Sequence, residues 1–224
     1  SVRAPRFDRW WLVAELLRAK TATEDEIAEA TGIDPWFLHE LGRIIEMEQR
    51  LTEAKDLTAE LLQEAKALGF GDALIETLRR SNPRKSKLRE SISALRRKSG
   101  IRPWVNQVDT CAGEFEAVTP YYYLAYERFS NPERAVEKKV TSKRKSAPKT
   151  VVVLGSGPNR IGQGVEFDYC CVKAVQAARE LGYETVMINC NPETVSTDYD
   201  LADRLYFEPL EKEFVEEILQ HEGE

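Results

Sequence analysis

The chain has 224 residues, of which 42% are hydrophobic and 31% charged, and its formal net charge at pH 7 is −6. This composition is typical of a globular protein with one large or two modest domains, the acidic balance disfavours a nucleic-acid binder, and we expect neither a membrane span nor a signal peptide. Two histidines and four cysteines without a Cys-x-x-Cys spacing do not supply a usual zinc site, so we expect a cytoplasmic protein with reduced thiols and no structural metal.

The first hundred residues follow a helical pattern of apolar positions. Thr23 and Glu26 fit a capping box that opens a short helix. Asp34 is a suitable N-cap for a longer helix, with Pro35 at its first position, where the missing N–H has no cost. The helices expected here begin or end within a few residues of 7–17, 24–30, 35–51, 58–68, 72–80 and 85–98.

The two helices between residues 24 and 48 have the outline of a helix-turn-helix. Ten acidic residues and only three basic ones lie between Thr23 and Asp56, whereas contacts to DNA phosphates require cations. The second helix also begins with Trp36 and Phe37 where donors that read bases should stand. We interpret these aromatic residues as core or as a protein interface, and favour the core for each one taken singly.

The amino-acid composition of the sequence changes after residue 100. Proline, aromatic and β-forming residues between Ile101 and Glu127 predict an irregular or extended segment with its own packing, rather than another helix. The lysine-rich stretch over residues 131–149 is interpreted as a solvated linker in preference to a phosphate-binding arm. We therefore assign residues 1–148 to one domain, mainly α-helical with an extended C-terminal segment and linker.

The remaining residues have a βαβ pattern. The β-branched run from Thr150 to Leu154 predicts a buried parallel strand. A helix over about 167–181, strands over 185–188 and 205–207 and a helix over 213–219 follow, in an order that predicts a right-handed crossover in an open α/β sheet. Two or three strands with one face covered make an unfinished domain. We therefore expect residues 149–224 to be the N-terminal part of a larger α/β domain, in a fragment that lacks a starting Met.

Gly155 and Gly157 follow the first of these strands, as in a dinucleotide-binding fingerprint. Arg160 stands at the position of the third glycine, and Asn189-Cys190-Asn191 occupies the place of the acidic partner of the ribose. We therefore expect a structural turn near some other ligand rather than a nicotinamide or flavin site.

Two long motifs in this part resemble one protein family: GSGPNRIGQGVEFDY over residues 155–169 and NCNPETVSTD over residues 189–198. Both resemble the opening of the carbamoyl-phosphate half of the carbamoyl-phosphate synthetase large subunit, and NR at 159–160 and PETVST at 192–197 match that second half rather than the related first half. Upstream, FLH at 37–39, VDTCA at 108–112, EFE at 114–116 and TPY at 119–121 resemble the oligomerisation domain of the same family. The resemblance runs through nearly the whole chain.

The resemblance implies a multi-domain fold class: a mainly α-helical oligomerisation domain, then the first βαβ part of a pre-ATP-grasp, Rossmann-like α/β domain. It implies an ATP-grasp ligase of arginine and pyrimidine biosynthesis, which uses ATP with Mg or Mn, and K, and works with a glutaminase small subunit. Carbamate made in the first half passes through a tunnel and is phosphorylated in the second. The ATP-binding domain is expected beyond Glu224, so no catalytic residue is assigned, and the chain alone is expected to be inactive and to bind no ATP tightly. Its expected partners are the small subunit and, through the helical domain, itself; neither nucleic acid nor membrane is expected.

The resemblance also implies tunnel-lining residues. Gly164 matches a glycine of the tunnel wall, where a missing side chain keeps the bore open. Glu166 and Glu193 match lining carboxylates, and Arg160 is a candidate partner for either. Because carbamate is an anion, two carboxylates facing it are costly unless protonated or hydrogen-bonded. We interpret these carboxylates as groups that orient the carbamate or relay its proton. The alternative is that each is a structural carboxylate paired with another group of the protein.

Two rival functions stay open. One is a stand-alone interaction module whose helices assemble subunits and whose α/β part is a non-catalytic remnant. The other is a helix-turn-helix regulator fused to a dinucleotide sensor, which requires binding of DNA and of a nicotinamide nucleotide.

Overall fold

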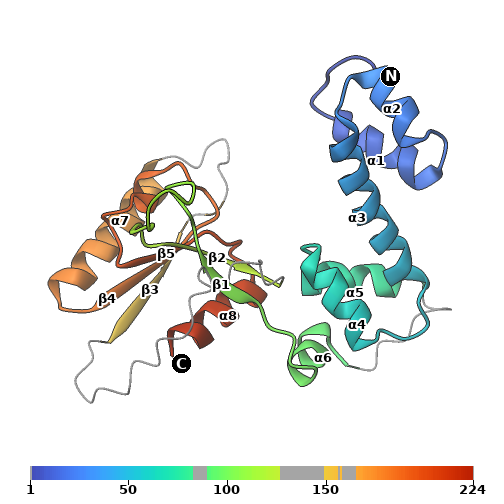
Figure 1. The fold of residues 1–224 in the computed structure, drawn as a ribbon. Helices are drawn as coiled ribbons and strands as arrows, with labels where there is room; N and C mark the ends of the chain where they lie inside the picture. The colour runs from blue at the N-terminus through green and yellow to red at the C-terminus, as the bar shows by residue number, and fades with distance from the viewer. Residues whose placement is uncertain (1, 83–89, 127–148, 156, 158–164, 224) are drawn as a thin grey trace. The chain divides into compact units, whose positions relative to one another are not determined.

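The structure is a computed structural model, and it describes residues 2–82, 90–126, 149–155, 157 and 165–223. The chain divides into two compact units, residues 1–99 and 100–224. The first contains only helices among its described residues, and the second contains a mixed sheet with helices (Figure 1).

The helical unit confirms the helices expected from the apolar pattern. Local caps explain why they begin where they do: the Thr23 hydroxyl accepts the N–H of Glu26 in a complete capping box, and Asp34 Oδ1 accepts the N–H of Trp36 at 2.9 Å. The expected start of the last helix, at residue 85, lies outside the described residues. The helices among the described residues of this unit are α1 Arg9–Ala19, α2 Glu24–Thr31, α3 Pro35–Glu53, α4 Ala59–Ala67, α5 Asp72–Ser81 and α6 Ile92–Lys98.

Helix α3 joins two small cores within this unit. Near its start, Leu38 packs with Val13 of α1 and Ile27 of α2 in a buried cluster. Near its end, the guanidinium of Arg79 on α5, which is 1% exposed, donates to the carbonyl oxygens of Leu51 at 2.7 Å and Lys55 at 3.1 Å. Because the last carbonyls of a helix lack partners within it, a buried cation there fixes α5 to the end of α3.

The aromatic residues near the starts of α1 and α3 lie on the surface, so the preference for core positions was wrong for Trp36 and Phe37, whereas Phe70 of the same unit is buried. Trp36 and Phe37 are 62% and 52% exposed and form an edge-to-face pair with ring centroids 4.9 Å apart. Phe7, Trp10 and Trp11, at the start of α1, are 92%, 46% and 68% exposed. Leu38, next to the exposed pair, is fully buried.

In the second unit, the described residues form a five-stranded sheet with the order β1-β2-β5-β4-β3. Strands β1 and β2 are antiparallel, while β2, β5, β4 and β3 run parallel to one another. The strands are β1 Trp104–Gln107, β2 Tyr121–Ala125, β3 Thr150–Leu154, β4 Glu184–Ile188 and β5 Arg204–Tyr206, accompanied by helices α7 Val165–Glu180 and α8 Lys212–Glu222 and the 3-10 helix η2 Val195–Thr197.

The boundary between the compact units differs from the expected division at 148/149. Residues 104–107 and 121–125 form strands of the α/β sheet rather than a segment with its own packing. The cause is the parallel pairing of β2 with β5, in which Tyr121 and Tyr122 lie opposite Leu205 and Tyr206. The lysine-rich stretch interpreted as a linker falls mostly outside the described residues and stays a prediction.

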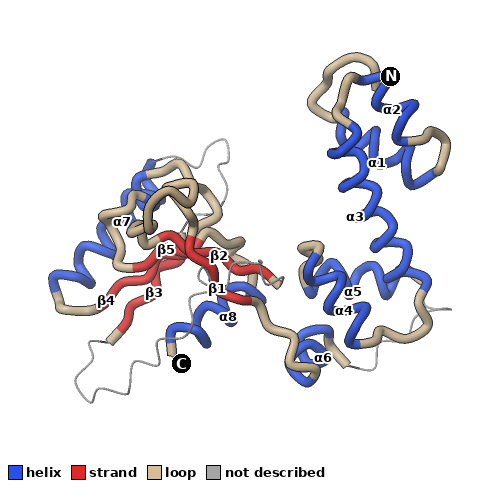
Figure 2. Tube along the Cα trace, in the orientation of Figure 1, coloured by secondary structure: helices blue, strands red, loops and turns tan. Residues whose placement is uncertain are grey.

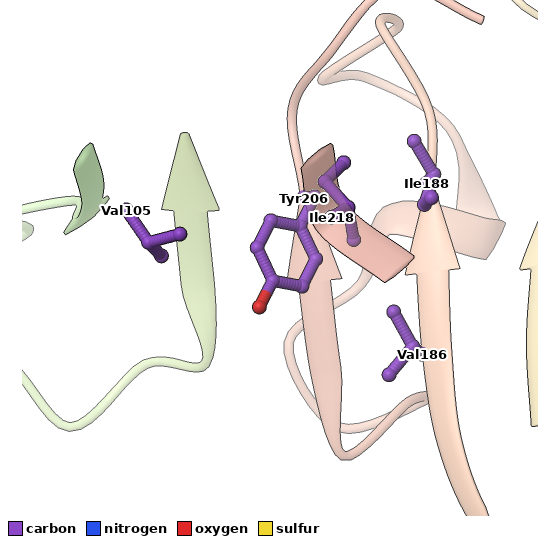
Figure 3. Close-up of a cluster of buried hydrophobic side chains, with 5 residues drawn as sticks. All are labelled: Val105, Val186, Ile188, Tyr206 and Ile218. Atoms are coloured by element: carbon purple, nitrogen blue, oxygen red, sulfur yellow. The ribbon is translucent and has the colours of Figure 1, made fainter. Parts of the chain in front are cut away.

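Helices cover both faces of the sheet, whereas the sequence suggested that one face was covered (Figure 2). Side chains alternate along β4. Val186 and Ile188 face α8 and pack with Ile218 (Figure 3), while Met187 faces the other way and packs with Val175 of α7. The expected strand–helix–strand pattern is confirmed, and the sheet has two apolar layers. The prediction that residues 150–154 form a buried strand was wrong, because β3 lies at the end of the strand order and none of its residues is fully buried.

Candidate functional site

Polar loops gather where three of the four parallel strands, β3, β4 and β5, end. Leu154, Ile188 and Tyr206 lie in register, so the residues that follow them leave the sheet at the same edge. In open α/β sheets, ligands bind at the carboxyl ends of parallel strands. The glycine-rich motif follows β3 and the Asn189–Asp198 motif follows β4, so both motifs meet this edge.

The first residues of the two motifs touch. The N–H of Gly155 donates to the carbonyl of Ile188 at 2.8 Å. A Cβ atom at Gly155 would lie 2.6 Å from Cγ of Asn189, which is fully buried. The glycine is therefore required by the close approach of the Asn189 side chain, and Gly157, with φ +78, turns the chain through a conformation that favours glycine. Both glycines thus have structural roles, as the sequence predicted.

The loop after β4 is held by its own side chains. Asn189 Oδ1 accepts the N–H of Asn191 at 3.2 Å, and Asn191 Oδ1 accepts the N–H of Glu193 at 3.0 Å. Asp168, from the first turn of α7, accepts the N–H of Ser196. The loop therefore has a defined backbone and presents Glu193 on its exposed side.

The structure places one of the four residues expected at the tunnel. Glu193 lies on the loop after β4, with an exposed side chain. Glu166 lies in the first turn of α7, but its side chain, like Gly164 and Arg160, lies outside the described residues. The roles of these four residues stay predictions.

A buried carboxylate that follows β5 was not predicted from the sequence. Glu208 is 6% exposed, and its Oε1 accepts the N–H of Leu124 just beyond the pairing of β2 with β5. Burial raises the pKa of Glu208 to about 7; the bond from Leu124 opposes this shift and the nearby carboxylate of Glu213 adds to it. Glu213 in turn accepts the hydroxyl of Tyr126 at 2.8 Å.

Asp168, Asn189 and Asn191 were also not recognised as site-building residues. The spacing Asn-x-Asn directly after a buried strand is typical of side chains that bond to the backbone two residues on, and this signal could have indicated a rigid loop. No such signal marks Asp168 or Glu208, whose partners lie 28 and 84 residues away.

Within the described residues, no three His, Cys, Asp or Glu side chains are grouped so that they could hold a metal ion. The Mg, Mn or K that the resemblance implies for the parent enzyme stays an expectation, and no chemical step is assigned to such an ion here. No helix among the described residues is long and apolar enough to cross a membrane.

Comparison with known proteins links the two units to one kind of protein. Residues 1–100 match the family described as carbamoyl-phosphate synthetase large chain, oligomerisation domain, and this match ends where the helical unit ends. Residues 147–224 match the family described as carbamoyl phosphate synthase preATP-grasp domain.

Curated relatives match across both units. The carbamoyl phosphate synthase large chain of Corynebacterium glutamicum is 50% identical over 94% of this chain and 18% of its own length. That of Streptomyces avermitilis is 51% identical over 94% of this chain and 17% of its own length, and that of Mycobacterium tuberculosis 47% identical over 100% and 19%. The chain therefore spans less than a fifth of the length of these relatives. It belongs to the family of carbamoyl phosphate synthase large chains.

Proposed function

We propose that the chain is a section of a carbamoyl phosphate synthase large chain, an ATP-dependent ligase that makes carbamoyl phosphate from bicarbonate, ammonia taken from glutamine and two ATP. The observation that carries this proposal is 47–51% identity to such large chains over 94–100% of this chain. ATP supplies the phosphoryl groups that activate bicarbonate and carbamate. In this proposal ATP and its metal ions bind in other parts of the large chain, and a glutaminase small subunit supplies the ammonia.

Within that enzyme, the loops at the carboxyl edge of the sheet form part of the carbamate tunnel wall. Gly164, Glu166 and Glu193 line it, with Arg160 in support. Glu193 is exposed on a loop that is fixed by buried asparagine side chains. This arrangement supports the role, because a group that orients carbamate must itself be held in place. A hydrogen bond or a proton on each carboxylate offsets its repulsion of the carbamate anion.

Replacement of Gly164 by phenylalanine in the complete large chain tests the tunnel. A ring in a passage sized for carbamate should stop its transit, so carbamoyl phosphate output should fall steeply. Bicarbonate-dependent ATP hydrolysis should largely persist, because neither ATP site is touched. The measurement is the amount of carbamoyl phosphate formed per ATP consumed.

Gly164→Ala is the control, since a single methyl group fits unless the backbone there needs a positive φ. Misfolding is the competing explanation, because overpacking costs about 1–3 kcal/mol. A thermal melt separates the two, as misfolding lowers both activities together. A Gly164→Phe chain that melts normally and still couples ATP use to product would remove Gly164 from the tunnel wall.

The helical unit supplies the surface for self-association in this proposal. Oligomer interfaces are enriched in aromatic residues, and Phe7, Trp10, Trp11, Trp36 and Phe37 are all 46% or more exposed. Burial of aromatic side chains of this size in an interface releases large apolar areas from water.

The double variant Trp11→Ser and Trp36→Ser should shift the chain towards monomer by at least tenfold in dissociation constant, since hot-spot tryptophans contribute about 2 kcal/mol or more each. Sedimentation equilibrium over a range of concentrations measures the shift. Phe115→Ser is the matched control: Phe115 is an aromatic residue, 76% exposed, in the other unit. A parent chain that stays monomeric at high concentration, or equal effects of the control, would contradict this assignment.

A further inference from the structure

The loop after β4 has a buried side made of polar residues and an exposed outer side. Asn189 and Ser196 are fully buried and Thr197 is 3% exposed, whereas Val195, between them in the sequence, is 57% exposed. Buried polar groups in proteins are almost always hydrogen-bonded, and here the partners come from three elements. Besides the bonds within the loop, the hydroxyl of Tyr121 on β2 donates to the carbonyl of Thr197 at 3.1 Å.

Asp168 connects the buried side of this loop to helix α7. Its two carboxylate oxygens lie 3.0 and 3.3 Å from the backbone nitrogen of Ser196, and its side chain is 8% exposed. Ser196 stands in the single turn of η2, and the first N–H groups of a helical turn have no acceptor within it. A side-chain oxygen held at this distance supplies the acceptor that this buried N–H would otherwise lack.

From Ser196, a chain of hydrogen bonds leads to Glu193. Asn189 Nδ2 donates to Ser196 Oγ at 3.4 Å, and Asn189 Oδ1 accepts the N–H of Asn191. Asn191 Oδ1 then accepts the N–H of Glu193 at 3.0 Å. A displacement of Ser196 is therefore transmitted through two asparagine side chains to the backbone of the exposed glutamate.

We infer that Asp168 is a positioning residue: it fixes η2 to α7 and thereby sets where the loop presents Glu193. This inference rests on the proposed function in one respect, namely that the location of Glu193 matters for the passage of carbamate. The location of the loop itself is a separate property and can be measured separately.

A simpler role for Asp168 would be a negative charge in the first turn of α7, where a helix favours anions whatever their exact place. Two substitutions distinguish the roles. Asp168→Asn removes the charge but keeps an oxygen at the same distance from Ser196. Asp168→Glu keeps the charge but moves the carboxylate by one methylene group.

Both variants are made in the complete large chain, and hydrogen exchange is followed in peptides covering residues 193–198 and, separately, in peptides of α7. If Asp168 positions the loop, Asp168→Glu accelerates exchange in residues 193–198 by about tenfold, the effect of losing one buried hydrogen bond, while Asp168→Asn stays near the parent. The opposite order, with Asn accelerated and Glu like the parent, overturns the inference in favour of a charge on α7. Unchanged exchange in both variants overturns it as well.

The second readout is carbamoyl phosphate formed per ATP consumed. A lower ratio in Asp168→Glu, restored in Asp168→Asn, supports the inference together with the tunnel role of Glu193. If exchange in the loop accelerates while the ratio stays at the parental value both in Asp168→Glu and in Glu193→Ala, Asp168 does position the loop but the proposed tunnel function of Glu193 fails. If Asp168→Glu loses protection throughout the unit, including α7 and the sheet, Asp168→Ala takes its place in the same assay, because it breaks the same hydrogen bond without adding volume. Faster exchange in residues 193–198 of Asp168→Ala then supports the inference, and unchanged exchange overturns it.

Discussion

Replacement of Asp72 by alanine is expected to lower the free energy of unfolding of the helical unit by about 3–5 kcal/mol, the usual cost of removing one partner from a buried ion pair. Asp72, in the first turn of α5, contacts two buried cations. Its Oδ1 lies 3.1 Å from Nζ of Lys66 on α4, and its Oδ2 lies 3.2 Å from Nε of Arg96 on α6. The side chains of Lys66 and Arg96 are 1% and 0% exposed, and that of Asp72 13%.

This carboxylate connects helices α4, α5 and α6, and its replacement removes a negative charge that contacts two buried cations. Peptide-resolved hydrogen exchange under denaturant measures the stability of the helical unit without interference from the sheet. Asp72→Asn, which keeps the shape, separates charge from packing and should cost nearly as much. Glu46→Ala, an exposed acid on α3, is the control and should stay within about 0.5 kcal/mol. A loss below 1 kcal/mol for both Asp72 variants would show that the two cations do not depend on this carboxylate.

Glu208→Gln is expected to stabilise the sheet unit at pH 8 by about 1–3 kcal/mol and to change its stability little at pH 4. Burial raises the pKa of Glu208 from 4.5 to about 7, so the folded unit holds a proton that the unfolded chain has lost between these pH values. Stability linked to this group is therefore present below about pH 4.5 and is lost as the pH rises to about 7, at roughly 1.4 kcal/mol per pKa unit. Glutamine keeps an oxygen for the N–H of Leu124 and carries no charge to desolvate.

The measurement is the unfolding free energy of the sheet unit at several pH values, by hydrogen exchange in peptides of β2, β5 and α8. Glu116→Gln is the matched control, because Glu116 is exposed on the loop before β2 and should show no pH-dependent difference. Equal stabilities of parent and Glu208→Gln at pH 8 would mean that Glu208 ionises in the folded unit at an ordinary pH.

Local chemistry explains why much of the secondary structure could be predicted. The capping box of Thr23 and Glu26 and the pair Asp34-Pro35 act within one turn, so they mark the starts of α2 and α3 in the sequence itself. The apolar run of β3 likewise predicts a strand without reference to a partner. Strand β2 could not be recognised in this way, because its place depends on β5, 84 residues further along the chain from Tyr121 to Leu205.

Burial and the site depend on contacts that the sequence does not display. Trp36 and Leu38 belong to the same apolar start of α3, yet one is 62% exposed and the other fully buried, because only Leu38 faces α1 and α2. At the site, Glu193 was identified through the family resemblance. The hydrogen bond between Asp168 and Ser196 was not predicted, because it joins two elements 28 residues apart. Such a bond becomes visible only when α7 is packed on the sheet.

The parallel pairing of β2 with β5 determines where this chain can be cut. A piece that begins at residue 149 would leave β5 as an open edge strand, with the N–H groups of Leu205 and Phe207 deprived of the carbonyls of Pro120 and Tyr122. Unpaired edges recruit other strands and lead to aggregation. Tyr206, which is 1% exposed, would also lose the cover of Tyr122, whose ring centroid lies 5.5 Å away. A soluble α/β piece must therefore begin at about residue 100, although its family match begins at residue 147.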